Sequence, residues 1–253
     1  MPGWWQEVVG LVLPAVCAGC GAVRGVLCEA CREALTGADL GPGRGPGGRR
    51  VRPRPVPGGL PPVYAAAPYE GVVRAVLLAH KERGALPLAE PLGAALAGAV
   101  RAGPLPGGPV VLVPVPSAPA RVRARGHDPV RRIALAAAAR LRREGTAVRV
   151  AAVLGQRRPV ADQAGLGARE RRRNLAGALY VRPGGAGLLA GARTVLVDDL
   201  VTTGATLAEA ARAVRAQAPA AAGPDLLAAV VAGPSDAFES RSEKTRTAPW
   251  GCE

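Results

Sequence analysis

Residues 192–210 read ARTVLVDDLVTTGATLAEA, and this stretch decides the fold class of the chain. The apolar run 195–197 predicts a buried strand, and the alanine-rich segment 206–217 predicts a helix. A short turn rich in glycine and hydroxyl groups joins the two. A strand that passes into a helix in this way is typical of open α/β sheets, which bind ligands outside the carboxyl ends of their strands.

The turn carries the polar groups that a phosphorylated sugar requires. Asp198 and Asp199 follow the strand, and two carboxylates can accept hydrogen bonds from two neighbouring sugar hydroxyls. The loop after them places hydroxyls and backbone N–H groups at a helix N-terminus, where the helix dipole favours a phosphate. Its residues are Thr202, Thr203, Gly204, Ala205 and Thr206. A purely structural interpretation stays open, with the acids ending a strand and Thr203 capping a helix, although paired acids are poor strand residues.

The remainder of the chain alternates between strand and helix patterns. Strands are predicted at 63–67, 110–113, 148–154 and 226–232, and helices at 71–81, 87–101 and 131–143. Alternation of this kind predicts a parallel sheet with helices on both faces, so the expected fold class is α/β.

The sequence divides into four regions. Residues 1–36 hold an amphipathic helix pattern around Trp4 and Trp5 and then a cysteine-rich module, and residues 37–62 read as a flexible linker rich in Gly, Pro and Arg. Residues 63–232 form the main domain, and residues 233–253 are predicted to be a disordered tail. The linker contains a run of arginines, which are either merely solvated or in contact with nucleic acid. They are Arg44, Arg49, Arg50, Arg52 and Arg54.

Composition narrows the class of protein. A hydrophobic fraction of 49% over 253 residues excludes wholesale disorder and allows a sizeable core. The formal charge of +14 suits a polyanionic partner, but nearly all the basic residues are arginine, as a GC-rich genome also produces. No signal peptide is evident, and the apolar segment 86–100 contains Glu90 and Pro91 and is too short to span a bilayer. We therefore expect no membrane span and a cytoplasmic location.

Four cysteines form two closely spaced pairs. Cys17-x-x-Cys20 and Cys28-x-x-Cys31 are separated by seven residues, and two such pairs can grip one metal ion from two sides. Zn²⁺ prefers four thiolates in a closed structural site, and a segment this small needs the metal for its folding energy. An iron–sulfur cluster and a redox pair are the alternatives. Cys252 stands apart and reads as an isolated thiol.

Taken in order, the motifs resemble those of the ComF family, competence-associated proteins related to phosphoribosyltransferases. The four-cysteine module comes first, and segments 69–74 and 80–84 are similar to the family's Tyr…Arg…Lys-Tyr-x-Gly pattern. Residues 113–126 are similar to its Pro-Val-Pro strand end and the start of its Arg-Gly-Phe-Asn-Gln element, and residues 158–174 to its Gln…Arg…Asn loop. The stretch 198–204 resembles the signature of type I phosphoribosyltransferases, so the resemblance runs from about residue 14 to residue 232.

Two segments depart from the family pattern. Arg-Gly-Phe-Asn-Gln is replaced by Arg125-Gly-His127-Asp128-Pro, and the tyrosine of Lys-Tyr-x-Gly is replaced by Glu82. Either the acceptor substrate has changed, or these positions drift on a solvated loop. His127 is also a candidate general base, because histidine is the residue most often used in that role.

The resemblance implies a type I phosphoribosyltransferase fold that binds 5-phosphoribosyl-1-pyrophosphate with Mg²⁺. Asp198 and Asp199 would then be the catalytic pair and the loop 202–206 the 5-phosphate site. The pyrophosphate would lie on the loop after residue 113, at Ser117, Arg121, Arg123 and Arg125. The segment 155–174 would close over the site as a lid and contribute Arg157 and Arg158.

Three functions remain open at this point. The first, which the family resemblance implies, is a phosphoribosyltransferase-like protein that supports DNA uptake, with single-stranded DNA or competence-machinery proteins as partners. The second is a salvage or biosynthetic phosphoribosyltransferase that acts on a base or an amine. The third is a noncatalytic regulator that retains the ligand site.

Overall fold

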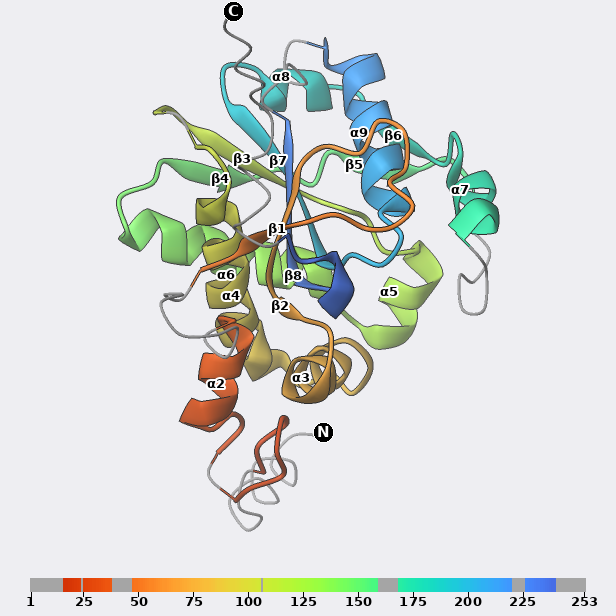
Figure 1. The fold of residues 1–253 in the computed structure, drawn as a ribbon. Coiled ribbons are helices and arrows are strands. Elements are labelled where there is room, and N and C mark those ends of the chain that lie inside the picture. The colour runs from red at the N-terminus through yellow and green to blue at the C-terminus, as the bar shows by residue number, and fades with distance from the viewer. Residues whose placement is uncertain are drawn as a thin grey trace, which may run out of the picture.

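The computed structural model describes residues 16–23, 25–37, 47–105, 107–158, 168–219 and 226–239. The centre of the fold is a six-stranded sheet (Figure 1). The strand order is β1-β2-β8-β7-β3-β4, in which β1 is antiparallel to β2 and all other neighbours are parallel. The strands are β1 (Arg49–Val51), β2 (Val63–Pro68), β3 (Val110–Pro114), β4 (Val148–Val150), β7 (Arg193–Leu200) and β8 (Leu227–Gly233). The predicted α/β class, with a mostly parallel sheet flanked by helices, is confirmed.

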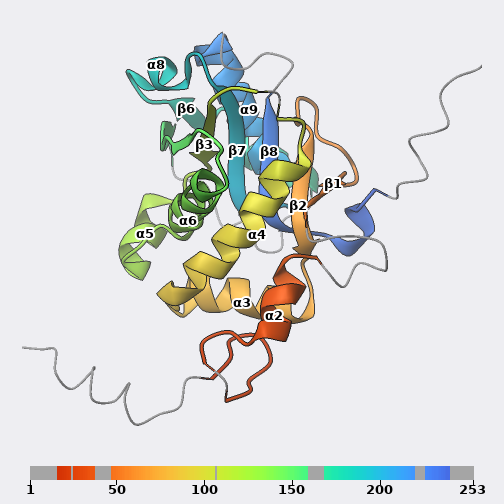
Figure 2. The ribbon, with the colours of Figure 1, turned by 90° about the vertical axis from the view of Figure 1, so that its left-hand side faces the viewer.

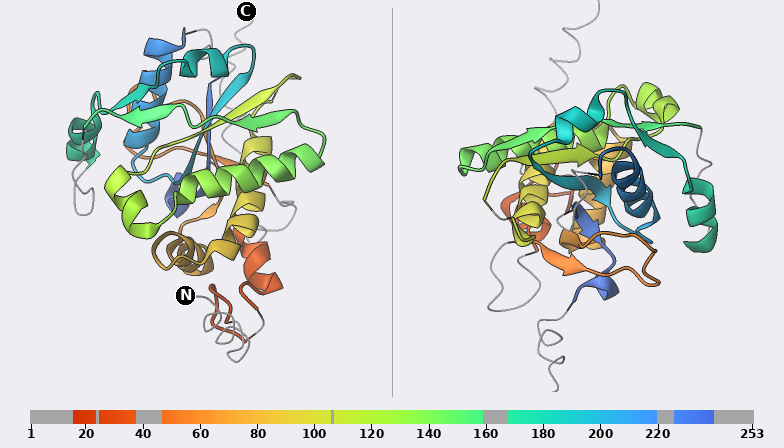
Figure 3. Two further views of the ribbon diagram at one scale, coloured as in Figure 1. Left: turned by 180° about the vertical axis from the view of Figure 1, so that it is seen from behind. Right: turned by 90° about the horizontal axis from the view of Figure 1, so that it is seen from above.

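Helices cover both faces of this sheet (Figures 2 and 3). The described helices are α2 (Glu29–Leu35), α3 (Gly71–Glu82), η2 (Leu86–Leu88), α4 (Ala89–Ala102), α5 (Pro119–Arg125), α6 (Pro129–Arg143), α7 (Ala168–Leu175), α8 (Gly185–Leu189), α9 (Ala205–Gln217) and η4 (Ser235–Ala237). One buried cluster joins α3, α4 and α6 to one face of the sheet, and a second joins α9 to the other. Because strand side chains alternate, Val110 and Leu112 of β3 belong to the first cluster and Val111 and Val113 to the second.

Two of the predicted strands differ from the structure by more than one residue. The strand predicted to end at residue 197 continues to Leu200, because Asp198 and Leu200 pair with β8. The strand predicted at 148–154 is two strands in different sheets. The chain turns between them, where the Val153 N–H donates to the Ala151 carbonyl, and β5 (Leu154–Gln156) pairs antiparallel with β6 (Leu179–Val181).

The segment predicted as a flexible linker is partly structured. Arg49–Val51 forms the edge strand β1, which a periodicity argument cannot detect in three residues. The predicted tail likewise begins with η4, and Phe238 forms a bridge with Val51. The predicted N-terminal helix and the end of the tail lie outside the described residues.

The small β5–β6 sheet is fastened to α9 by side chains that substitute for strand partners. The Leu179 N–H donates to the Glu209 carboxylate at 3.0 Å, and the Val181 N–H donates to the Gln217 amide oxygen at 2.8 Å. Arg212 pairs with Glu209 at 2.7 Å. Within the described residues, no helix is both long and apolar enough to cross a membrane.

A close helix–helix contact gives a stability prediction. At Gly93 of α4, a Cβ would stand 2.8 Å from the backbone nitrogen of Ala137 in α6, whereas at Gly98 of the same helix the nearest atom is 3.7 Å away. Gly93→Ala is therefore expected to lower the free energy of unfolding by about 2–3 kcal/mol through overpacking. Gly98→Ala is expected to raise it by about 0.5–1 kcal/mol, because alanine is the better helix former. Chemical denaturation measures both changes in the free energy of unfolding. If both substitutions shifted it in the same direction, the close contact between Gly93 and α6 would be contradicted.

Candidate functional site

The strand order places the candidate site at the carboxyl edge of β3 and β7. From β3 the chain continues to β4 on one side, whereas β7 lies on the other side of β3. Such a reversal of strand order opens a crevice at the carboxyl ends, where open α/β sheets bind ligands. The Val115 N–H donates to the Val197 carbonyl at 2.9 Å, so the loop after β3 is held beside the first carboxylate of β7.

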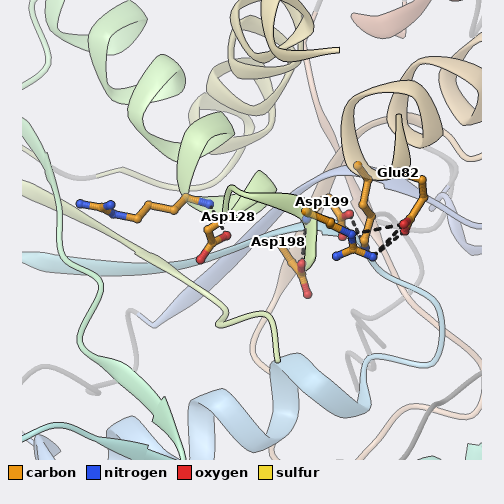
Figure 4. Close-up of polar contacts among 7 residues, drawn as sticks. Glu82, Asp128, Asp198 and Asp199 are labelled. Carbon is orange, nitrogen blue, oxygen red and sulfur yellow. Dashed lines mark hydrogen bonds and ion pairs between the residues drawn. The ribbon is translucent and has the colours of Figure 1, made fainter. Parts of the chain in front are cut away.

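Asp198 and Asp199 lie near the end of β7, two residues and one residue before its last residue, Leu200, and their carboxylates are neighbours (Figure 4). Asp199 faces α3, because Lys81 of that helix contacts its carboxylate. The Asp198 carboxylate accepts a hydrogen bond of 2.8 Å from the Asp199 N–H. The two acids therefore lie next to each other at the strand end, where one ligand can contact both.

Lys81, at the end of α3, forms an ion pair with Asp199 of this acidic pair. Its Nζ lies 2.6 Å from the Asp199 Oδ2, and the Asp199 side chain is only 7% exposed. Burial and the neighbouring charge of Asp199 raise the pKa of Asp198 well above its usual value, although Lys81 opposes this. Burial lowers the pKa of Lys81, but the carboxylates of Asp199 and Asp198 outweigh that effect and raise it overall.

The predicted phosphate loop follows β7 and leads into α9. Gly204 has a φ of 75°, in the left-handed region, so a side chain there would be strained. It would also be obstructed, because a Cβ at this position would stand 3.0 Å from the Leu60 side chain. Thr203 accepts a long hydrogen bond of 3.5 Å from the Ala205 N–H, whereas the Thr202 side chain is exposed. α9 begins at Ala205, one residue before the predicted start, so Thr206 lies in its first turn, where backbone N–H groups have no partner within the helix.

The residues predicted for the pyrophosphate lie on the loop after β3 and on α5. Ser117 is half-buried two residues before α5 begins, and Arg121 and Arg123 are exposed on that helix. Arg125 differs, because its guanidinium forms a bidentate ion pair with Glu82 at the end of α3. Its Nη2 lies 2.7 Å from one Glu82 oxygen, and its side chain is 12% exposed.

Arg157 and Arg158 follow β5, and both make contacts within their own substructure. The Arg157 guanidinium lies 5.1 Å from the centre of the Tyr180 ring. Arg158 donates to the carbonyl of Asn174 at 2.7 Å and to that of Ala176 at 3.2 Å, at the end of α7. Gln156 links this substructure to the loop after β3, because its amide donates to the Pro116 carbonyl at 3.4 Å.

His127 and Asp128, where the chain departs from the family pattern, both make structural contacts. His127 is buried, and its ring centre is 5.6 Å from that of buried His80 in α3. This packing explains why a ring occupies position 127. The predicted role of His127 as a general base is not needed to explain it. Asp128 accepts from the Arg131 N–H at 3.1 Å and caps α6, and the proline after it occupies the first helical position.

The four cysteine sulfurs form one compact group that could hold a metal ion such as zinc. The Sγ atoms of Cys17, Cys20, Cys28 and Cys31 all lie within 4.8 Å of one another, and two of the separations are 3.7 Å. A tetrahedral Zn²⁺ at its usual sulfur distance requires about 3.8 Å between sulfurs. Burial raises the pKa of Cys17, but backbone N–H donors lower it to about 6 overall, which favours the metal-binding thiolate. Burial and the surrounding thiols raise the pKa of Cys31.

Sequence reasoning alone missed Lys81 and Glu82 as site residues. Both lie within the segment 80–84 that resembles the family pattern, but the sequence does not indicate a partner for either. Their partners Asp199 and Arg125 lie 118 and 43 residues further along the chain, and no local pattern indicates such pairs. No protein-family model and no curated protein sequence matches this chain. Residue chemistry and geometry therefore carry the functional inference.

Proposed function

We propose that this chain is a ComF-like member of the type I phosphoribosyltransferase fold and binds 5-phosphoribosyl-1-pyrophosphate with Mg²⁺. The observation that carries the proposal is the meeting of three elements at the β3–β7 switch point. These are the acidic pair of β7, the Thr-Gly loop that opens α9, and the loop after β3. In this proposal the acids meet the ribose hydroxyls, and the N-terminus of α9 meets the 5-phosphate.

The chemistry of the acidic pair also suits the cation. Carboxylate oxygens are ligands that Mg²⁺ accepts, and this ion usually keeps several waters and shares its remaining positions with substrate phosphates. Asp198 and Asp199 would hold it from the strand end, and the ion would neutralise charge on the pyrophosphate. The side chains would bind and orient the ribose, and positioning and charge stabilisation would supply most of the rate enhancement.

The family resemblance extends the proposal to a cytoplasmic protein that supports uptake or handling of single-stranded DNA, with competence-machinery proteins as partners. Arg52 and Arg54 support a polyanion contact, because both are exposed in the segment after β1. The four-cysteine group supports a structural Zn²⁺ and sets the chain apart from a simple salvage enzyme, which needs no such module.

The test is calorimetric titration of the full chain with 5-phosphoribosyl-1-pyrophosphate in the presence and absence of Mg²⁺. Saturable binding that requires Mg²⁺ is the expected result, and no binding would overturn the proposal. Release of pyrophosphate, screened against bases and amines, then separates a transferase from a protein that only binds the ligand.

A further inference from the structure

The last two residues of α3 carry opposite charges and contact two different parts of the candidate site (Figure 4). The Lys81 Nζ lies 2.6 Å from Asp199 of β7. Glu82 accepts three hydrogen bonds from Arg125 of α5, at 2.7, 2.9 and 3.2 Å. The Lys81 ammonium therefore contacts the acidic pair, and the Glu82 carboxylate contacts Arg125. The two residues are adjacent in the last turn of α3.

These ion pairs differ from ordinary surface salt bridges, in which both partners are well exposed. In each pair here, the partner from the candidate site is the better buried one: the Asp199 side chain is 7% exposed against 32% for Lys81, and that of Arg125 is 12% exposed against 48% for Glu82. Packing also holds the end of α3 in place, because His80 is fully buried and its Nδ1 lies 3.2 Å from the Ala85 carbonyl oxygen. The two charges are thus presented to the site by a fixed backbone.

We propose that Lys81 and Glu82 are internal substitutes for the ligand, occupying the places of its divalent cation and its pyrophosphate. This inference deepens the proposed function, on which it rests, since it names the groups that the ligand displaces. A divalent cation bound to a diphosphate offers the same two signs of charge as Lys81 and Glu82. The cation suits the carboxylates, and the diphosphate suits the guanidinium of Arg125. A divalent cation on Asp199 would lie close to the Lys81 ammonium, and a pyrophosphate on Arg125 would lie close to the Glu82 carboxylate, so charge repulsion favours exchange of both ion pairs on binding.

The experiment measures each ion alone, without the sugar. Mn²⁺ binding is followed by electron paramagnetic resonance, and inorganic pyrophosphate binding by calorimetry in the presence of a chelator, both with the full chain. Lys81→Met is expected to bind Mn²⁺ at least ~10-fold more tightly than the parent, which corresponds to about 1.4 kcal/mol. Glu82→Gln is expected to bind pyrophosphate more tightly by the same factor.

Matched controls separate local exchange from a change in net charge. Arg83→Met removes a positive charge from the exposed neighbour of the same turn, and Glu90→Gln removes an exposed carboxylate from α4. Neither control is expected to shift the affinity for either ion more than about twofold, because exposed charges are well screened. Lys81→Met/Asp199→Asn is expected to lose the gain in Mn²⁺ affinity.

The inference is overturned if Lys81→Met binds Mn²⁺ no more tightly than Arg83→Met, or if Glu82→Gln binds pyrophosphate no more tightly than Glu90→Gln. Lys81→Gln and Glu82→Ala repeat the two arms, so that one poorly folded variant does not decide the outcome. Neither arm uses 5-phosphoribosyl-1-pyrophosphate. Failure of the proposed function therefore appears in the sugar titration, and failure of this inference appears in the ion titrations.

Discussion

Asp198→Asn/Asp199→Asn is expected to bind 5-phosphoribosyl-1-pyrophosphate at least ~100-fold more weakly than the parent chain. The substitution keeps the shape of both side chains and removes both carboxylates. A hydrogen bond to a charged group contributes about 1.5–3 kcal/mol, so two of them account for a factor of roughly 100 or more. Calorimetry in Mg²⁺ measures the change.

Two further variants make this result specific. Asp198→Asn alone leaves the Lys81–Asp199 ion pair intact, so it separates loss of a ligand contact from disturbance of α3. Glu29→Gln removes a carboxylate that is 78% exposed in the cysteine module, and it is expected to bind like the parent. Parent-like affinity in the double asparagine variant, with an unchanged melting curve, would show that the acids do not meet the ligand.

Loss of the metal from the four-cysteine group is expected to destabilise the whole chain. Leu35 of α2 is fully buried and belongs to the same cluster as α3 and α4, so the module is packed onto the main domain. Cys31→Ser removes a buried sulfur of the proposed zinc site, and it is expected to bind less zinc and to lower the free energy of unfolding by about 3 kcal/mol. For a chain of this size that corresponds to about 6–12 °C in melting temperature.

Metal content by atomic absorption and melting by circular dichroism check this prediction. Cys252→Ser is the matched control, because it removes the remaining cysteine and is expected to keep one zinc per chain. Atomic absorption also distinguishes zinc from iron. An iron–sulfur cluster would in addition absorb visible light. If Cys31→Ser binds no metal but has the same melting temperature as the parent, the metal has no structural role.

The fold was most predictable where short segments carry their own pattern. The helices at α3 and α9 and the strands at β3 and β8 follow from apolar periodicity over 5 to 13 residues. β1 and the break between β4 and β5 did not, because each element is three residues long and depends on a distant partner. The extension of β7 through the two acids also depends on a distant partner. Pairing with β8 outweighs the poor strand propensity of aspartate.

The sequence by itself determined the chemical groups of this protein: an acidic pair, a Thr-Gly loop before a helix, and two cysteine pairs at metal-binding spacing. These are local features, because adjacent residues must share a turn or a strand end. Only the tertiary structure decided which charges meet. Lys81 reaches Asp199 and Glu82 reaches Arg125 because α3 ends beside both the carboxyl edge of β7 and α5. Such contacts depend on sheet order and helix packing, to which residues far apart in the chain contribute together.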